Sequence, residues 1–374
     1  MLQNKIYHNF IIEIFKTFLI ILFGFSVVAL TVRAVNFLDL IVDSGYQITT
    51  YFQYSLFNFF GIAPKFIPLS FLLALTIFII KHKQDSEFII LWTSGVKKIY
   101  IVNLFFLASL MVLILYLILS TFLTPLALNK SRQLLSNNNF SSFLPTVKTH
   151  QFSDSFKGFT FIVGKKIDNE LQNIFLHDKG NNLKNLSTNT SKTNSTTIMA
   201  KNGIIDNKKM ILFNGQIIST NNNAENEIIK FEQLNIDLSN LTTTTIKKPK
   251  IQETSTLELF ECLSNKNPQK KSICNKNFKK EILSTLNRRI VIPFYIPVLS
   301  LICGMLLIKS KKLYLNNISI FLYSFILLLF TELAVRYTGI NNIILLTFIL
   351  LPFSLFIILY SYLIYKFSKN SVSA

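Results

Sequence analysis

The fold is decided by the stretch TFLIILFGFSVVALTVRAV at residues 17–35, which is apolar apart from Arg33. A helix rises about 1.5 Å per residue, so about 20 apolar residues cross the hydrocarbon core of a bilayer. The segment is too long for the core of a signal peptide, and no small-residue cleavage site follows it. It therefore predicts a retained membrane-spanning helix.

Further apolar segments repeat this pattern along the chain. They cover about 55–80, 99–123, 290–308, 318–335 and 343–365. Hydrophobic residues make up 50% of the 374 residues and charged residues only 15%, where a soluble domain has about a quarter charged. The sequence predicts an α-helical polytopic membrane protein with six transmembrane helices in a 3+3 arrangement around a long polar insert.

Domain boundaries follow from these segments. Residues 1–125 are expected to hold the first three helices, with a short cytoplasmic helix near 84–94. Residues 126–285 are expected to form a periplasmic β domain with its linker, and residues 286–374 the last three helices.

Lysines in the short loops predict the orientation. Residues 81–98, 309–312 and 366–369 carry lysines, whereas the loops at 39–50 and 337–342 have no Lys or Arg. The positive-inside rule then places both termini in the cytoplasm and the long insert outside. A net charge of +19 could also suggest nucleic acid. A general bias toward lysine along the chain explains the charge better, and no nucleic-acid partner is expected.

Alternating apolar residues in the insert are typical of strands. Phe159, Phe161 and Val163 alternate with polar or small residues, and Phe213 and Phe231 lie in similar runs. Turn clusters such as Asn214-Gly215 separate the runs, which favours a β-sandwich or jelly-roll-like domain. Cys262 and Cys274 could form a disulfide, but their spacing favours scattered thiols.

Catalytic motifs are weak. The nearest match to a P-loop, from Gly158 to Lys166, has five residues between its glycines and lacks the Ser or Thr that binds magnesium. The four histidines have no metal-ligand spacing, and no nucleophile elbow is present. The sequence predicts neither an enzyme nor a metal or cofactor site, so another chain would have to hydrolyse any ATP that drives the protein.

Charges within or beside the apolar segments are the first candidate site. Such charges are costly and usually face a partner or a cavity. Two alternatives remain: Glu332 and Arg336 pair at i,i+4, or the arginines snorkel to headgroups. If the charges share an anionic ligand, the cations that would bind it are Arg33, Lys65, Arg288, Arg289 and Arg336.

The first cytoplasmic loop is the second candidate site. Residues 83–92 are expected to form a short amphipathic helix that begins at Asp85 or Ser86 and ends at Ser94-Gly95. It either lies on lipid, anchored by Trp92, or docks as a coupling helix into a cytoplasmic ATPase. The acids Asp85 and Glu87 favour a protein partner.

These motifs resemble those of the lipopolysaccharide-export permeases LptF and LptG, over essentially the whole chain and with a slight preference for LptF. Trp92 stands where the family is expected to have a small or charged residue. The stretches that carry the resemblance are Pro64…Pro68-Leu69, Asp85-Ser86-Glu87…Trp92-Thr93-Ser94-Gly95-Val96, Arg288-Arg289-Ile290…Pro293…Pro297, and Ala200-Lys201-Asn202-Gly203-Ile204 with Leu212-Phe213-Asn214-Gly215.

The resemblance implies a transporter subunit of the bacterial inner membrane. Two permeases, one of each type, would bind a dimer of the ATPase LptB and extract lipopolysaccharide from the membrane. The β domain would pass acyl chains to LptC and LptA along a path formed by Phe159, Phe161, Phe213 and Phe231, although inward Phe residues also serve any β-sheet core. The coupling residues would be Asp85, Glu87, Trp92 and Gly95.

Two other classes of function compete with a transporter. A non-transporting scaffold that transmits force to a periplasmic enzyme would also carry a coupling helix. A membrane-embedded hydrolase is disfavoured by the lack of a catalytic motif.

Overall fold

The computed structural model describes two compact units, each treated separately below. One comprises residues 1–32, 57–129 and 248–374, and the other residues 33–56 and 130–247. The described residues are 2–38, 41, 48–137, 149–156, 158–167, 170–179, 193–206, 209–221, 226–237, 250–264, 278–308 and 313–372. Residues 309–312 and most of 39–50 and of the expected linker therefore lie outside the described residues.

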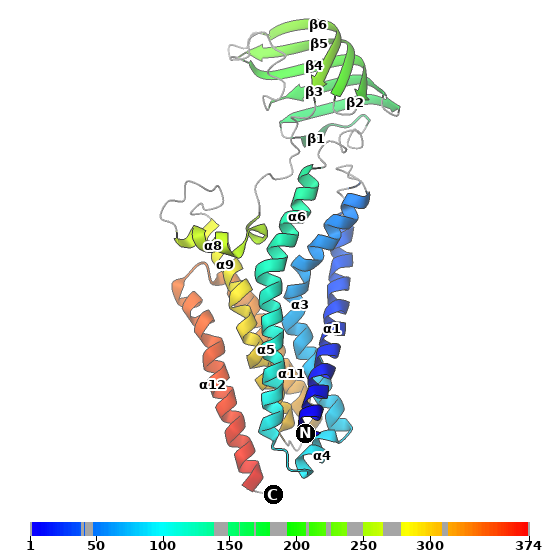
Figure 1. Cartoon of the computed structure of the whole chain (residues 1–374). Helices are drawn as coiled ribbons and strands as arrows, with labels where there is room; N and C mark the ends of the chain where they lie inside the picture. The colour runs from blue at the N-terminus through cyan, green and yellow to red at the C-terminus, as the bar shows by residue number, and fades with distance from the viewer. Residues whose placement is uncertain are drawn as a thin grey trace. The chain divides into compact units, whose positions relative to one another are not determined.

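The first unit is helical (Figure 1). Its N-terminal elements are α1 (Leu2–Asn36), α3 (Ile48–Gln84), α4 (Glu87–Thr93), α5 (Lys98–Ile118), the π-helical turn η1 (Leu119–Leu123) and α6 (Thr124–Asn137). Its C-terminal elements are η4 (Ile251–Glu253), α8 (Thr256–Ser264), α9 (Lys279–Ile290), η7 (Ile292–Phe294), α10 (Tyr295–Gly304), η8 (Met305–Leu307), α11 (Leu313–Tyr337) and α12 (Asn342–Val372).

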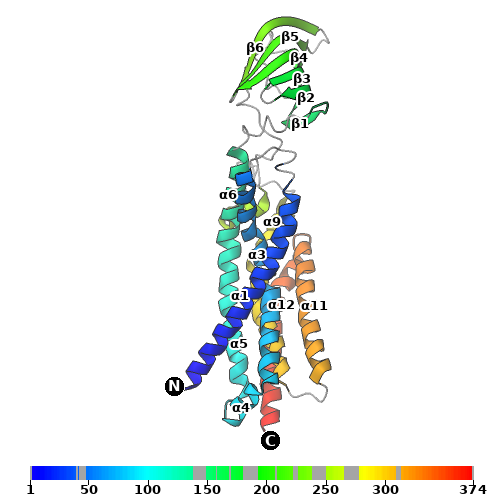
Figure 2. The same cartoon turned by 90° about the vertical axis from the view of Figure 1, so that its right-hand side faces the viewer.

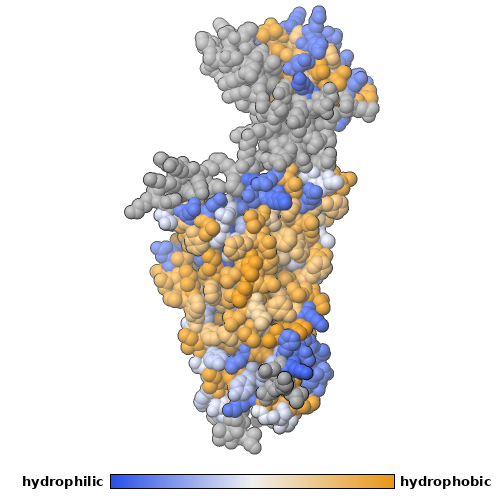
Figure 3. Space-filling view, viewed as in Figure 1, coloured by the Kyte–Doolittle hydropathy of each residue, from blue (hydrophilic) through white to orange (hydrophobic). Residues whose placement is uncertain are grey.

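Six helical segments of the described chain are long and apolar enough to cross a membrane. They cover 5–36, 48–84, 98–135, 279–307, 317–337 and 342–368, so the six predicted spans are confirmed. Figure 3 shows a broad apolar band across the helical unit, with hydrophilic residues gathered at both of its ends. Both termini of the chain and α4 lie at one end of this unit (Figure 1).

Helix α10 lies at the centre of the helical unit, and all ten of its residues are buried. It packs against α5, α11 and α12. By contrast, α11 and α12 leave many large apolar side chains exposed, among them Phe330, Leu333 and Ile357. These exposed faces are suited to lipid, since lipid is as apolar as the side chains themselves.

Hydroxyl groups compensate for the prolines in these helices. Pro64 has no N–H to donate to the carbonyl of Phe60, and the hydroxyl of Thr124 donates to that oxygen at 2.8 Å instead. A membrane interior offers no water to satisfy such carbonyls, so these bonds hold the broken helices together. The same arrangement recurs at Thr121 O before Pro125 (from Thr256, 2.9 Å), Arg289 O before Pro293 (from Ser120, 3.1 Å) and Phe348 O before Pro352 (from Tyr295, 2.9 Å).

The second unit contains an antiparallel sheet of six described strands in the order β1-β2-β3-β4-β5-β6. The strands are β1 (Ser153–Phe156), β2 (Phe159–Ile167), β3 (Glu170–Asp178), β4 (Thr193–Asp206), β5 (Lys209–Asn221) and β6 (Asn226–Asp237). Figure 2 shows that the sheet is strongly curved. The inserted all-β domain is confirmed. Its described strands form a meander of sequential neighbours, whereas a jelly roll would have Greek-key crossings between two sheets.

Two asparagines shift the apolar face of the sheet by one residue. Asn173 and Asn214 have φ of 53° and 51°, a left-handed conformation that Asn tolerates better than most residues. Before Asn214 the fully buried side chain is Leu212 and Phe213 is only half-buried, whereas beyond it Ile217 is buried. Strict alternation of inward and outward side chains predicts that Phe213 faces the core. This expectation is wrong, because the left-handed conformation of Asn214 shifts the core-facing positions by one residue.

The other three phenylalanines of the expected acyl-chain path do face the core of the sheet. Phe159 and Phe161 are each 1% exposed. Phe231 is partly buried and lies opposite Gly215, where any Cβ would collide with its ring and with the carbonyl of Met199. An aromatic ring covering a cross-strand glycine is a known way to fill a sheet.

Cysteine pairing differs from the expectation. Cys262 on α8 is disulfide-bonded, and Cys303 on α10 is a free, buried thiol. Cys274 lies outside the described residues. The expectation of scattered thiols is therefore wrong for Cys262, because sequence spacing does not show which cysteines folding brings together. Disulfides persist in oxidising compartments such as the bacterial periplasm.

Candidate functional site

An ion pair joins α9 to α11 in the part of the helical unit remote from α4. Arg288 Nη2 lies 2.7 Å from Glu332 Oε2, and the two side chains are 30% and 47% exposed. The hydroxyl of Tyr116 donates to the carbonyl of Arg288 at 3.1 Å. The buried Nε of Arg288 makes no hydrogen bond within the described chain. The guanidinium therefore keeps unused donor capacity beside its one carboxylate partner.

This ion pair contradicts one interpretation that the sequence left open, the pairing of Glu332 with Arg336. Glu332 pairs with Arg288 of another helix instead of with Arg336, one turn further along α11. Arg336 is exposed near the end of that helix. Glu332 thus neutralises an arginine that the sequence assigned to lipid binding.

Arg289 does not have the role that was expected of it. Its side chain is only 4% exposed, and both terminal nitrogens are used within the protein. Nη1 donates to Thr254 O and Thr256 Oγ1, each at 3.0 Å, and Nη2 donates to Gln252 O at 2.9 Å. The side chain clamps the segment that connects η4 to α8 onto α9. We therefore omit Arg289 from the lipid-binding residues.

The remaining two predicted cations are exposed. Lys65 lies on α3 between Pro64 and Pro68. Arg33 lies on the last turn of α1, in the other unit, where Tyr51 of α3 donates a hydrogen bond to Ala34 O at 2.9 Å. Because the two units are described separately, Arg33 is not placed relative to Arg288.

The second candidate site is α4, a helix of seven residues at the opposite end of the helical unit. Gly95 follows it with φ of 91°, as its predicted role in ending the helix requires. Gly95 N–H donates to Trp92 O at 3.1 Å, and Val96 N–H to Leu91 O at 3.0 Å. These two bonds form a Schellman motif, in which buried Val96 and Leu91 supply the usual apolar contact.

The beginning of α4 differs from the expected cap. Ser86 stands at the N-cap position with φ of 59°, and its side chain makes no capping hydrogen bond. Asp85 precedes it and is exposed. The N-terminal end of α4 must therefore be held by contacts of another kind.

The two faces of α4 have different environments. Phe88 and Leu91 are buried in the core of the helical unit. Ile89 and Ile90 are 53% and 64% exposed, although they lie at the polar end of the unit. The helix thus presents an apolar surface outward.

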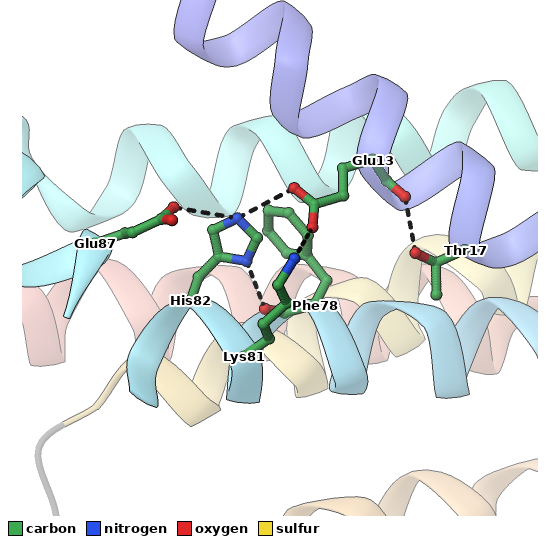
Figure 4. A network of polar contacts seen from close by, with 6 residues as sticks. All are labelled: Glu13, Thr17, Phe78, Lys81, His82 and Glu87. Carbon is green, nitrogen blue, oxygen red and sulfur yellow. Dashed lines mark hydrogen bonds and ion pairs between the residues drawn. The ribbon is translucent and has the colours of Figure 1, made fainter. Parts of the chain in front are cut away.

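Two expected docking residues contact the chain itself. Figure 4 shows Glu87 beside His82 of α3, with Oε2 at 3.3 Å from Nε2 of the imidazole. Trp92 is half-buried and stacks on Phe88, with the ammonium group of Lys98 4.4 Å from the centre of its ring. Glu87 is nevertheless 48% exposed, so its docking role stays a prediction, and Ile89 and Ile90 add an apolar surface that was not expected.

Residues that sequence reasoning missed complete both sites. Tyr116 and Ser120 fix the backbone of Arg288 and Arg289, and Glu13 of α1 contacts His82. Glu13 had a usable signal, since it is the only acid in α1. A lone acid in a membrane-spanning helix calls for a partner. Among the described residues, no group of His, Cys, Asp and Glu could hold a metal ion.

Together the fold and its sites define a class: a polytopic membrane protein whose two groups of helices flank an inserted β-sheet domain. The family model described as "Lipopolysaccharide export system permease LptF/LptG" matches residues 10–366, nearly the whole chain. The chain belongs to this family, and the match does not distinguish LptF from LptG. No curated protein matches the chain. As a member of this family, it is a component of a lipopolysaccharide export system and not an enzyme.

Proposed function

We propose that the chain is one of two permease subunits of an ABC transporter in the bacterial inner membrane. Its partners are a paired permease and a dimer of the ATPase LptB, which supplies the ATP hydrolysis. No cofactor binds to this chain. Lipopolysaccharide enters the helical unit from the membrane and leaves through the β domain toward LptC and LptA. The family does not favour the alternative of a non-transporting scaffold.

The observation that carries this proposal is the apolar outer face of α4. Ile89 and Ile90 project from a helix whose inner face is locked into the core by Phe88 and Leu91. An amphipathic helix with exposed apolar residues suits a groove on a protein partner. Asp85 and the end of α4 at Gly95 complete this surface.

Changing Ile90 to Asp is expected to weaken binding of the ATPase. The charge would have to be desolvated in the apolar groove, whereas the exposed position leaves the fold intact. Co-purification with the ATPase measures the effect. Gln84→Asp, which adds the same charge to an exposed site at the end of α3, is the control and should bind normally. Normal binding by Ile90→Asp would leave only a helix that rests on lipid.

The proposed binding of lipopolysaccharide rests on the charged residues remote from α4. Arg288 is 30% exposed, and its terminal nitrogens face a partner carboxylate that a phosphate group can displace. Charge-assisted hydrogen bonds from guanidinium to phosphate are strong and directional. Lys65, Arg33 and Arg336 are exposed cations that would add to this attraction. Phe159, Phe161 and Phe231 would serve acyl chains only if the sheet opens, because they are its core.

Both termini are proposed to lie in the cytoplasm, and Cys262 provides the test. In intact spheroplasts, a membrane-impermeant thiol reagent should label nothing until an impermeant reductant opens the disulfide, and should then label Cys262. Cys303 is 1% exposed and should stay unlabelled. Labelling of Cys262 that requires lysis of the spheroplasts would reverse the orientation.

A further inference from the structure

His82, near the end of α3, is 3% exposed and lies in a cage of aromatic rings. Its ring centre is 4.0 Å from that of Phe78, 5.0 Å from that of Phe10 and 5.8 Å from that of Phe88. These rings come from α1, α3 and α4. The ring of Phe78 lies 4.0 Å from the imidazole at an interplanar angle of 34°, close enough for a cation–π contact with an imidazolium.

The polar contacts of His82 are all with hydrogen-bond acceptors (Figure 4). Nδ1 lies 3.0 Å from the carbonyl oxygen of Phe78. Nε2 lies 3.3 Å from a carboxylate oxygen of Glu13 and 3.3 Å from one of Glu87. A neutral imidazole has one N–H, so its bare nitrogen would face an acceptor lone pair. Only the imidazolium donates from both nitrogens.

The charges of Glu13, Lys81, His82 and Glu87, which form one cluster, sum to zero if His82 is protonated. Lys81 Nζ lies 2.7 Å from the other oxygen of Glu13. With His82 protonated, the cluster holds two cations and the carboxylates of Glu13 and Glu87, and its net charge is zero. A neutral His82 would leave one uncompensated carboxylate beside a buried ring. The other charged groups on α1 are Lys5, Lys16 and Arg33, and those on α3 are Lys65 and Lys83, which donates to Leu306 O. Asp85 precedes α4, and Lys98 of α5 lies over Trp92.

The imidazole joins three elements. Glu13 is on α1, His82 on α3 and Glu87 at the first position of α4. The N-terminal end of α4 lacks a side-chain cap, and the contact of Glu87 with His82 adds a polar tie there to the apolar packing of Phe88. Displacement of a docked α4 would therefore pull on Glu13 through His82.

We propose that His82 is a positioning residue that, as an imidazolium, ties α4 to α1 and transmits movement of α4 to the membrane-spanning helices. The tie requires that both ring nitrogens of His82 donate, Nδ1 to Phe78 O and Nε2 to the carboxylates. This inference rests on the docking role proposed for α4.

The protonation state is tested first, on the full chain in detergent micelles with ¹⁵N-labelled histidine. The signal of His82 is identified by its loss in His82→Gln. At neutral pH it should show both ring nitrogens protonated. His8, which is exposed on α1, gives a second signal that is identified by its loss in His8→Gln. A singly protonated His82 at neutral pH would overturn the proposal.

The tie itself is tested with a spin label on Thr93→Cys, an exposed position of α4. The label should be ordered in the otherwise native chain and should lose part of its ordered component in His82→Gln. His82→Lys keeps a cation and should retain more of that order. An equally ordered label in His82→Gln would show that the tie does not exist.

Transmission is tested in the complex with the paired permease and the ATPase. His82→Gln should keep ATP hydrolysis but release less lipid per ATP, and His8→Gln should behave as wild type. If Ile90→Asp loses the ATPase while His82→Gln keeps the native ratio, docking stands and transmission by His82 is wrong. If Ile90→Asp binds normally, the proposed docking fails, and the spin label still decides whether His82 holds α4.

Discussion

Replacing Arg289 by Ala should lower the free energy of unfolding of the helical unit by about 1.5–3 kcal/mol or more, since a hydrogen bond from a charged group contributes that much and Arg289 donates several. Three hydrogen bonds from the guanidinium would be lost. The carbonyls of Gln252 and Thr254 would lose their charged donor. Thermal unfolding of the purified chain in detergent, followed by circular dichroism, measures the loss.

Two variants distinguish this clamp from a contact with substrate. Arg289→Lys should recover only part of the stability, because an ammonium group cannot match the planar fork that reaches three oxygens. Arg288→Ala removes a half-exposed ion pair and should cost far less, about 1 kcal/mol or below. Equal stability losses at the two positions would refute the assignment of Arg289 as a clamp.

The second large effect is expected on lipid binding. Arg288→Ala should weaken retention of a phosphorylated lipid by roughly tenfold to a hundredfold, since a hydrogen bond to a charged group contributes about 1.5–3 kcal/mol. Arg288→Lys should restore part of this binding. Quantitative mass spectrometry of lipid retained through purification gives the measurement.

Glu332→Ala changes the other residue of the ion pair and is the control for Arg288→Ala. It removes the carboxylate that competes with phosphate for Arg288, so lipid retention should be unchanged or stronger. If Arg288 and Glu332 are only a structural pair, both variants should lower stability alike and neither should change the retained lipid. That pattern would remove Arg288 from the substrate site.

The membrane architecture could be predicted from the sequence because its cause is local. A run of about 20 apolar residues has to cross the bilayer whatever its neighbours are. The alternation at Phe159 and Phe161 likewise predicts strands with a buried face. It failed at Phe213, where the left-handed backbone of Asn214 shifts the face by one residue.

The pairing of charges could not be predicted, because it depends on which helices meet. Glu332 has Arg336 one turn away in the sequence, yet it contacts Arg288 of α9. Arg288 and Arg289 are neighbours and look equivalent in sequence. Their side chains have different surroundings because successive residues of an α-helix are about 100° apart around its axis.

In α4, too, some features could be predicted from the sequence and others could not. A short helix that ends at Gly95 followed from composition and turn chemistry, but its start did not, because Lys83 and Gln84 continue α3 and α4 begins at Glu87. Glu87 looked like a docking residue because acids on a helix usually face outward. Its side chain is 48% exposed, so that role stays a prediction, and it also contacts His82, whose own position was set by packing against Phe10 and Phe88.

The central claim is that this chain, with its partners, takes lipopolysaccharide out of the membrane. The most direct test purifies the complex in native lipid patches and identifies the bound lipid by mass spectrometry before and after addition of ATP. We predict a phosphorylated glycolipid that is enriched over the surrounding membrane, is depleted by ATP, and is reduced in Arg288→Ala. Only bulk phospholipid, in membrane proportions and unaffected by ATP, would contradict the claim.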